Sequence, residues 1–231
     1  PYPATDEMQF ITIASLGDGT DFGDLNTSMV GHYSGNDKTR GIVGASESSN
    51  SNVIEYYTIQ SLGDSVDFGD RASGQYKYAT GSVASTTRGL IMGGYDVPSA
   101  ATVNNIDFLT IQTLGNTQEF GDLTISGSSQ GTASNATRAI RMGRYPTNNV
   151  IDFVTIATEG NAIDFGDMAV LNEYDGRSCA NPTRYVHQGG SSTDNVMQFV
   201  EIATTGNTQD FGDLVVGRRG HASISNGHGG L

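Results

Sequence analysis

The sequence predicts an all-β protein built from one repeated unit, and three observations carry that prediction. A short apolar strand ending in isoleucine, a turn and then Asp/Glu-Phe-Gly-Asp occur together five times, centred on Phe22, Phe68, Phe120, Phe165 and Phe211. Successive phenylalanines are 45 to 52 residues apart. Gly, Ser, Thr, Asn and Asp crowd between the apolar runs, as in proteins with many strands and turns. A period of roughly 40–50 residues with four strands per unit is typical of a β-propeller. We therefore expect a single domain, residues 1–231, with five four-stranded antiparallel blades.

Each unit divides into four expected strands. In the third unit these are Leu123–Ala133, Thr137–Gly143, Asn149–Ile156 and Asp164–Met168. The third strand of a unit has apolar residues at both odd and even positions. Because these point to opposite faces of the strand, both faces are expected to be buried between neighbouring blades. A Gly-Asp or Gly-Asn pair lies between the third and fourth strands, and these residues tolerate positive φ and form tight hairpins.

The second strand opens with Thr-Arg in four units, at Arg40, Arg88, Arg138 and Arg184. We expect the phenylalanine of each Phe-Gly-Asp to pack between blades. Its aspartate should accept backbone N–H bonds or meet one of the Thr-Arg arginines.

The two ends of the chain are expected to complete one blade. Met8–Asp24 supplies the third and fourth strands of a unit, and Leu214–Leu231 supplies the first and second. Pairing of the N-terminal with the C-terminal strands would close the ring and leave no free sheet edge.

The residues of the last unit carry a resemblance to a known family. Arg219–Ser223, followed by Gly229-Gly230 and an Asp-Phe third strand, resembles a kelch repeat, with the phenylalanine of Phe-Gly-Asp in place of the usual tryptophan. The whole repeat more closely resembles kelch-like proteins of tailed phages of marine bacteria, especially cyanophages. That resemblance implies a virion, tail-fibre or adhesion component, located on the phage particle, in contact with other virion proteins and multimeric. Outside a phage, it would be a soluble secreted or cell-surface protein.

Charge and composition narrow the partners. The formal net charge is −13 and the 12 Lys and Arg residues are scattered, so nucleic acid is not expected. No apolar run approaches the roughly 18 residues of a membrane span, so membrane insertion is not expected. No signal-peptide pattern is visible. Cys179 is the single cysteine, which rules out an internal disulfide.

The motifs that suggest catalysis are better explained as structure. Asp-Phe-Gly is the magnesium motif of kinases, but here it recurs without a glycine-rich loop. Gly127–Gly131 matches a nucleophile elbow, yet no helix is expected after it. The acidic turns lack calcium-loop spacing, and His221 and His228 have no nearby ligand partners. We therefore expect no enzyme activity, no catalytic residues, no metal site and no cofactor.

Comparison of the five copies separates a constant face from a variable face. The turn between the third and fourth strands and the Phe-Gly-Asp are nearly constant, whereas the connection from each fourth strand to the next first strand differs: Asn26–Ser34, Arg71–Ala79, Thr124–Thr132, Ala169–Arg177 and Val215–Ser223. The loops between second and third strands vary too, and both kinds of connection share one face of an up-and-down blade. Function concentrates on variable loops held by a rigid scaffold. Drift where structure permits it would produce the same pattern.

The variable face also carries the expected ligand-binding side chains. They are His32, Tyr33, Tyr76, Tyr78, Tyr95, Tyr145, Tyr174 and His221. Aromatic faces with hydrogen-bonding tips suit a sugar or a protein surface. The leading hypothesis is a non-enzymatic phage tail-fibre or adhesion domain that binds a host surface glycan or envelope protein.

Three alternatives stay open from the sequence. A lectin-like propeller unrelated to phage would have one sugar site per blade. An enzyme of the galactose oxidase or sialidase type would need convergent catalytic groups. A purely structural decoration protein would bury its constant face or a blade edge in a viral particle.

Overall fold

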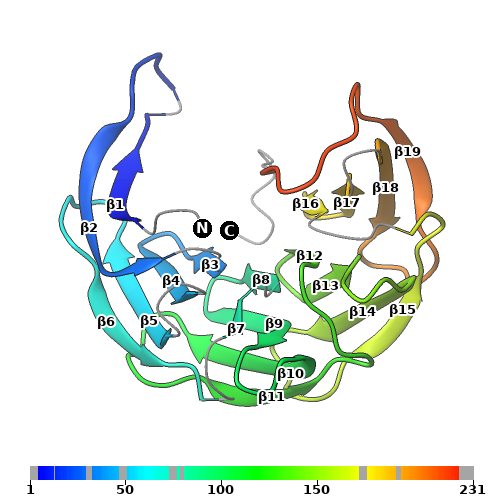
Figure 1. Cartoon of the computed structure of the whole chain (residues 1–231), viewed down its shortest axis with the longest axis horizontal. Coiled ribbons are helices and arrows are strands. Elements are labelled where there is room, and N and C mark those ends of the chain that lie inside the picture. Colours follow the sequence, from blue (N-terminus) through cyan, green and yellow to red (C-terminus); the bar gives the residue numbers. More distant parts are fainter. Residues whose placement is uncertain are drawn as a thin grey trace.

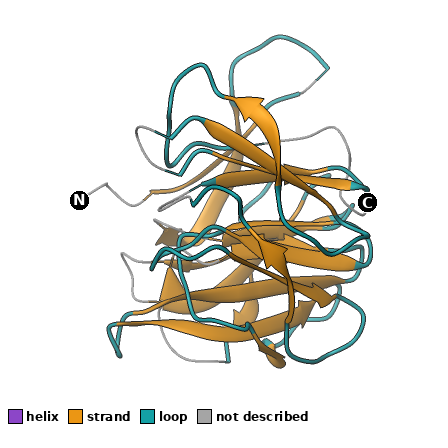
Figure 2. Ribbon diagram, turned by 90° about the vertical axis from the view of Figure 1, so that its right-hand side faces the viewer, coloured by secondary structure: helices purple, strands orange, loops and turns teal. Residues whose placement is uncertain are grey.

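The computed structural model describes residues 5–12, 14–29, 33–46, 51–72, 77–78, 81–171, 176–190 and 194–223. These residues form antiparallel β-sheets joined by turns and loops, and they contain no helix. The expectation of an all-β protein is confirmed. The sheets follow one another along an open arc (Figure 1), and in the side view the loops gather on two opposite sides of the body (Figure 2).

Five sheets follow in chain order. The first has two strands, β1 (Thr5–Phe10) and β2 (Thr20–Met29). The second contains β3 (Tyr33–Asn36), β4 (Arg40–Ser46), β5 (Ser51–Thr58) and β6 (Val66–Asp70). The third contains β7 (Lys77–Tyr78), β8 (Gly81–Ala84), β9 (Arg88–Asp96), β10 (Ala101–Thr110) and β11 (Gln118–Asp122).

The last two sheets repeat the four-stranded pattern. The fourth contains β12 (Gly131–Ser134), β13 (Arg138–Met142), β14 (Val150–Thr155) and β15 (Ile163–Asp167). The fifth contains β16 (Arg177–Ala180), β17 (Arg184–Gln188), β18 (Val196–Glu201) and β19 (Gln209–Asp213). The strand order in each is simple up-and-down. The first strands of the units, β3, β8, β12 and β16, line the inside of the arc, and β6, β11, β15 and β19 form its rim (Figure 1).

The expected second, third and fourth strands agree closely with the structure, but the expected first strand is too long. Only Gly131–Ser134 of the region around Leu123–Ala133 forms a regular strand, β12. The residues before it cross the ends of two sheets instead. The Gly127 N–H donates to the Val103 carbonyl (3.2 Å), and Ser128 and Tyr145 exchange backbone hydrogen bonds (2.8 and 2.9 Å).

The third strand of each four-stranded sheet lies in the middle of the packing. In β14, the consecutive side chains of Ile151, Asp152, Phe153 and Val154 are all buried. Burial of adjacent residues, which point to opposite faces, confirms that both faces of this strand are covered.

Neighbouring sheets are joined by a repeated main-chain contact, which we call the clasp: the Phe-Gly-Asp of one last strand held by the Gly-Asp/Asn turn of the next sheet. Between the third and fourth sheets, Gly160 N–H donates to the Phe120 carbonyl (2.8 Å), and Ala162 N–H donates to the Asp122 carbonyl (2.7 Å). The Asp122 N–H in turn donates to Asn161 Oδ1 (3.0 Å). The same three bonds join the other neighbours from Phe22 to Gly206.

Glycine is required in the clasp for two reasons. Gly121 has a φ of 151°, and a Cβ there would lie 2.4 Å from the Gly160 carbonyl oxygen.

The phenylalanine of each clasp packs edge-to-face on an aromatic ring of its own third strand, as Phe120 does on Phe108 with ring centroids 6.0 Å apart. Phe22, Phe68, Phe120 and Phe165 are buried, as expected for a residue that packs between sheets.

The Thr-Arg arginines do not meet the clasp aspartates in the part of the chain that the structure describes. Arg138 instead stacks its guanidinium on Phe153, 4.8 Å from the ring centroid, and donates from Nη1 to the Ile202 carbonyl of the next sheet (2.8 Å). Arg40 and Arg88 make the equivalent pair of contacts. Arg40, Arg88 and Arg138 therefore each connect the third strand of their own sheet to the backbone just after the third strand of the next sheet.

Closure of a ring is not seen among the described residues. β1 pairs with β2 alone, and the stretch 214–223 contains no strand. The rest of the expected C-terminal strand region, residues 224–231, lies outside the described residues. The first and last sheets lie on opposite sides of the opening in the arc (Figure 1).

We predict that Gly121→Ala destabilises the protein more than Gly160→Ala. Both glycines have nearly the same φ, 151° and 150°, but a Cβ at Gly160 meets nothing within 4 Å. Each substitution should cost about 1–3 kcal/mol of backbone strain. Gly121→Ala should cost about 1–3 kcal/mol more, because it pushes the clasp apart. Urea unfolding of the two variants measures the difference, and equal losses would contradict the clasp as a stabilising contact.

We also predict that Arg138→Ala lowers stability by about 1–2 kcal/mol more than Arg184→Ala, the value of a hydrogen bond from a charged group. Arg184 has the same stacking contact, on Phe199 at 4.2 Å, but it pairs with Glu201 of its own sheet at 2.6 Å. An exposed pair of that kind contributes little. Thermal unfolding of both variants tests the idea, and an unchanged melting temperature for Arg138→Ala would exclude the inter-sheet contact as a source of stability.

Candidate binding surface at the variable end

Antiparallel pairing sorts the connections onto two ends of the sheets. At one end of the sheets, second strands end and fourth strands connect to the next unit; we call this the variable end. The opposite end carries the clasp turns, and we call it the constant end. At the variable end the connections lie directly over the strand ends. The Gly94 N–H donates to the Gly127 carbonyl (2.9 Å), and the Gly190 N–H donates to the Arg218 carbonyl (3.1 Å).

Tyr95 and Tyr145 both lie at the variable end, at or just beyond the ends of second strands. Tyr95 is in β9, is half-buried, and faces Tyr78 of β7 in the strand register. Tyr145 follows β13 and is 41% exposed. Its backbone is fixed by the two hydrogen bonds with Ser128. Of the expected ligand-binding residues with described side chains, Tyr145 presents the most open ring.

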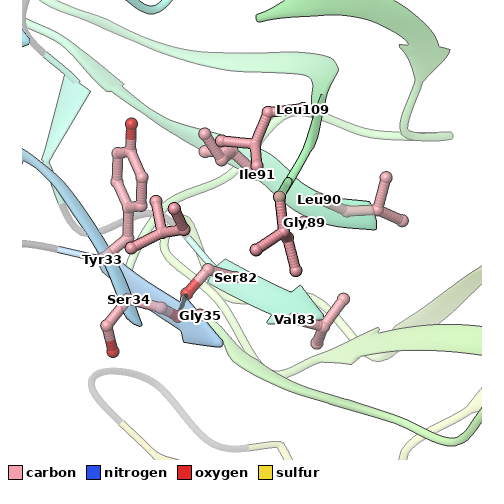
Figure 3. A pocket seen from close by; sticks show the side chains of 11 residues that line it. Tyr33, Ser34, Gly35, Ser82, Val83, Gly89, Leu90, Ile91 and Leu109 are labelled. Atoms are coloured by element: carbon pink, nitrogen blue, oxygen red, sulfur yellow. Dashed lines mark hydrogen bonds between the residues drawn. The ribbon is translucent and has the colours of Figure 1, made fainter. Parts of the chain in front are cut away.

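Two other expected residues are less accessible. Tyr33 is buried between the second and third sheets, where burial raises the pKa of its hydroxyl. Its ring therefore belongs to the interior (Figure 3). His221 is half-buried, its carbonyl accepts a hydrogen bond from Arg177 Nε (2.8 Å), and its pKa is lowered by burial and by nearby Arg177 and Arg218.

The remaining expected residues cannot be compared with the structure. His32, Tyr76 and Tyr174 lie outside the described residues, and for Tyr78 only the backbone is described. The structure thus brings Tyr95 beside the Tyr78 position and places Tyr145 and His221 at the same end of later sheets.

A buried polar floor under the variable end was not anticipated from the sequence. Arg141 and Asp152 form an ion pair with both side chains fully buried, and Thr124 Oγ1 donates a hydrogen bond to the same carboxylate. Arg144 lies beside them and donates to the Ser126 carbonyl. Burial, and next the Arg141 charge, lowers the pKa of Arg144 to about 10, although Asp152 partly offsets this. Breaking such a buried pair is costly, so the network holds the connection above it rigidly.

The sequence does contain a signal for this floor. Arg141 occupies the position three residues after the Thr-Arg arginine, where the second and third sheets have Val43 and Ile91. A charge in an apolar register position usually requires a buried partner. The same reasoning applies to Arg71, which follows Phe-Gly-Asp where other units have Leu or Met and pairs with buried Asp107 at 2.5 Å.

The middle residue of the repeated triad in each third strand, such as Asp152 in Ile151-Asp152-Phe153, makes buried polar contacts with the neighbouring sheet. Glu55 accepts a hydrogen bond from the Asn26 N–H (2.9 Å) of the preceding sheet. The Gln198 amide binds both the N–H and the carbonyl of Val170, at 3.0 and 2.7 Å. Asp107 and Asp152 occupy the same position, and each interface therefore satisfies its buried polar group with different partners.

His187 of β17 is buried between the fourth and fifth sheets. Its Nδ1 lies 2.9 Å from Ser178 Oγ. Glycines surround the ring: a Cβ at Gly131 or Gly143 would come within 3 Å of it. Burial, and then the charges of His221 and Arg177, lowers its pKa to about 3, so the ring is neutral near neutral pH.

The cavities limit what can bind. The space between the second and third sheets (Figure 3) measures about 10 Å³ and is lined mostly by apolar groups, so it is too small for more than a water molecule. A much larger groove, about 820 Å³, lies beside β1 and is lined by Met8, Phe10, Phe22, Val43 and Ile59 among others. Within the described residues, no group of three or more His, Cys, Asp or Glu is arranged to hold a metal, and no helix is long and apolar enough to span a bilayer.

Neither of these two cavities is lined by Tyr95, Tyr145 or His221. Strand pairing fixes the backbone of Tyr95, and the Ser128 hydrogen bonds fix that of Tyr145, which follows Arg144 of the buried polar floor. The carbonyl of His221 is held by Arg177. Such fixed aromatic and polar groups lose little entropy on binding.

Comparison with known proteins returned no matching family model and no matching curated sequence.

We predict that His187 makes the protein acid-sensitive. Its pKa falls from an ordinary 6.5 to about 3 in the folded chain, so its contribution to stability is present above pH 6.5 and is lost as the pH falls towards 3. The loss should be about 1.4 kcal/mol per pH unit in that window. Denaturant unfolding at about pH 7.5 and about pH 5.5 measures it, with His187→Gln as the control that should lose less. Equal losses in both proteins would refute the role of this histidine.

Proposed function

We propose that the chain is a non-enzymatic adhesion domain of a phage particle that binds a host surface glycan or envelope protein through its variable end. The observation that carries the proposal is the division between the two ends. One repeated main-chain contact holds the constant end of every described interface, whereas the connections at the other end differ in sequence and carry Tyr95, Tyr145 and His221.

This division is what a recognition scaffold needs. The clasp uses backbone groups and the side chain of one turn residue, so loops at the variable end can change without loss of the interface. Aromatic rings bind the apolar faces of sugars, and hydroxyl and imidazole groups bind their hydroxyls. Localisation on the virion and contacts with other virion proteins follow from the phage resemblance and belong to the same proposal.

The architecture that we propose is a five-bladed, kelch-like β-propeller. Its fifth blade would be a composite of β1 and β2 with strands from Leu214–Leu231. The groove beside β1 supports this, because in the other sheets the third strand has a partner on both edges, whereas among the described residues β1 is paired on one edge only. The inner two strands of a blade would fill the space next to Met8, Phe22 and Val43.

A purely structural role in a viral particle is the second candidate. It is favoured by three equivalent leucines at the tips of the clasp turns, Leu16, Leu62 and Leu114, which are 105%, 65% and 54% exposed. A row of exposed apolar tips on the constant end suits contact with another protein. A lectin-like propeller with one sugar site per blade is less favoured, because Tyr95 and Tyr145 are not repeated in every unit.

We predict that the purified, labelled chain binds a glycan array or intact marine bacterial cells, and that Tyr95→Ala with Tyr145→Ala weakens binding at least about tenfold, as expected for loss of aromatic anchors. The matched control is Leu62→Ala with Leu114→Ala at the constant end, which should leave binding unchanged. A well-folded chain that binds neither array nor cells would favour the structural role. Loss of binding only in the leucine control would place the contact at the constant end.

A further inference from the structure

The two sides of the opening in the arc expose the two halves of one clasp. Phe211 is 48% exposed, whereas the four equivalent phenylalanines are at most 9% exposed. Within the described part of the chain, a Cβ on Gly212 would meet only the Met197 methyl carbon at 3.8 Å, while each equivalent glycine has a turn carbonyl within 2.6 Å of that position. The Phe-Gly-Asp of β19 thus has the clasp sequence without a turn against it in the described chain.

The turn between β1 and β2 is the missing counterpart. Leu16–Gly19 has the sequence of a clasp turn, and Leu16 is fully exposed. By the geometry of the other four clasps, the N–H groups of Gly17 and Gly19 would donate to the Phe211 and Asp213 carbonyls. The Asp18 carboxylate would accept the Asp213 N–H, as Asp64 accepts the Asp24 N–H at 3.0 Å.

A second, independent match lies deeper in the same interface. The triad Met8-Gln9-Phe10 repeats the triad Met197-Gln198-Phe199. The Gln198 amide binds both backbone groups of Val170, five residues after Phe165 in the preceding sheet. The residue five positions after Phe211 is Val216, which is exposed, as is Gln9. Gln9 could therefore bind the backbone of Val216 in the same way.

We propose that β19 and residues 214–223 after it bind the β1–β2 hairpin of a second copy of this chain, head to tail. The proposal rests on the composite blade proposed above and assigns its two halves to two copies. The reason is their placement, since within one chain the hairpin and β19 lie on opposite sides of the opening (Figure 1). An interface between different surfaces of identical subunits builds rings or filaments according to its rotation.

The test uses single-cysteine variants in a Cys179→Ser background. One preparation carries Asp18→Cys, the other carries Asp213→Cys, and the two are mixed and treated with a short bismaleimide. We expect a covalent dimer in the mixture, with much less in either preparation alone, because each copy then supplies only one half of the clasp. The geometric control is a chain with Asp122→Cys and Asn161→Cys, which should cross-link within itself because the clasp there is already formed.

A measurement without cysteines accompanies it. Sedimentation of the wild-type chain should show a mass that rises with concentration. Asp18→Ala should weaken the association about tenfold, the equivalent of one hydrogen bond to a charged group. Glu119→Ala removes the same charge from an exposed position of β11, outside both halves of the proposed interface, and should leave the association unchanged.

Two results would overturn the proposal, and they differ in meaning. A monomer at all concentrations whose Asp18→Cys/Asp213→Cys double variant cross-links only within itself would show that the ring closes inside one chain, so the composite blade stands and the second copy does not. Absence of both cross-linking and association, with the control pair cross-linked, would refute the composite blade as well. Neither result bears on glycan binding, which is read separately.

Discussion

The structure depends on a main-chain contact between sheets, repeated at each interface from the first sheet to the fifth. Most sheet proteins form their backbone hydrogen bonds within sheets and leave contacts between sheets to side chains. Here each last strand also receives N–H donors from the turn of the next sheet. The contact fixes spacing and orientation at the rim with three hydrogen bonds and a pair of glycines, such as Gly121 and Gly160. Because this contact is the same in every described interface, the rest of each unit is free to differ.

The units differ most at the variable end, where charged side chains occupy some buried positions that are apolar in other units. Arg71 and Arg141 form buried ion pairs with Asp107 and Asp152, and these two arginines occupy positions where other units have Leu, Met, Val, Ile or His. Each pair anchors a connection of different length and sequence. The exposed and half-exposed rings of Tyr145 and Tyr95 therefore stand on supports that are individual to their units, above a frame that is not.

Much of the fold could be predicted from the sequence, because the repeat exposes its own periodicity. The second, third and fourth strands lie where the apolar runs and Gly-Asp/Asn turns place them, and the burial of the clasp phenylalanines follows from their invariance among the copies. The expected first strand, Leu123–Ala133, is longer than β12 because Leu123–Gln130 is held by hydrogen bonds to residues distant in the sequence. A local sequence pattern does not reveal such bonds. Tyr33 lies in Asn26–Ser34, a stretch that differs between the copies and so predicts a place on the variable face, yet its ring is buried between two sheets. The arginine contacts could not be predicted either, since their acceptors are backbone carbonyls more than 60 residues away.

The buried polar position of the third strand has a consequence for how such a chain finds its own order. Units with nearly identical clasps can dock in the wrong sequence, a characteristic hazard of repeat proteins. Glu55, Asp107, Asp152 and Gln198 each have a different partner in the preceding unit. Skipping the second sheet, for example, would set Asp107 of the third sheet against Asn26 of the first, and the buried carboxylate would lose the guanidinium of Arg71. The side chain at this position therefore distinguishes each unit from the others. The free-energy cost of pairing it with the wrong neighbour favours the correct order of sheets during folding.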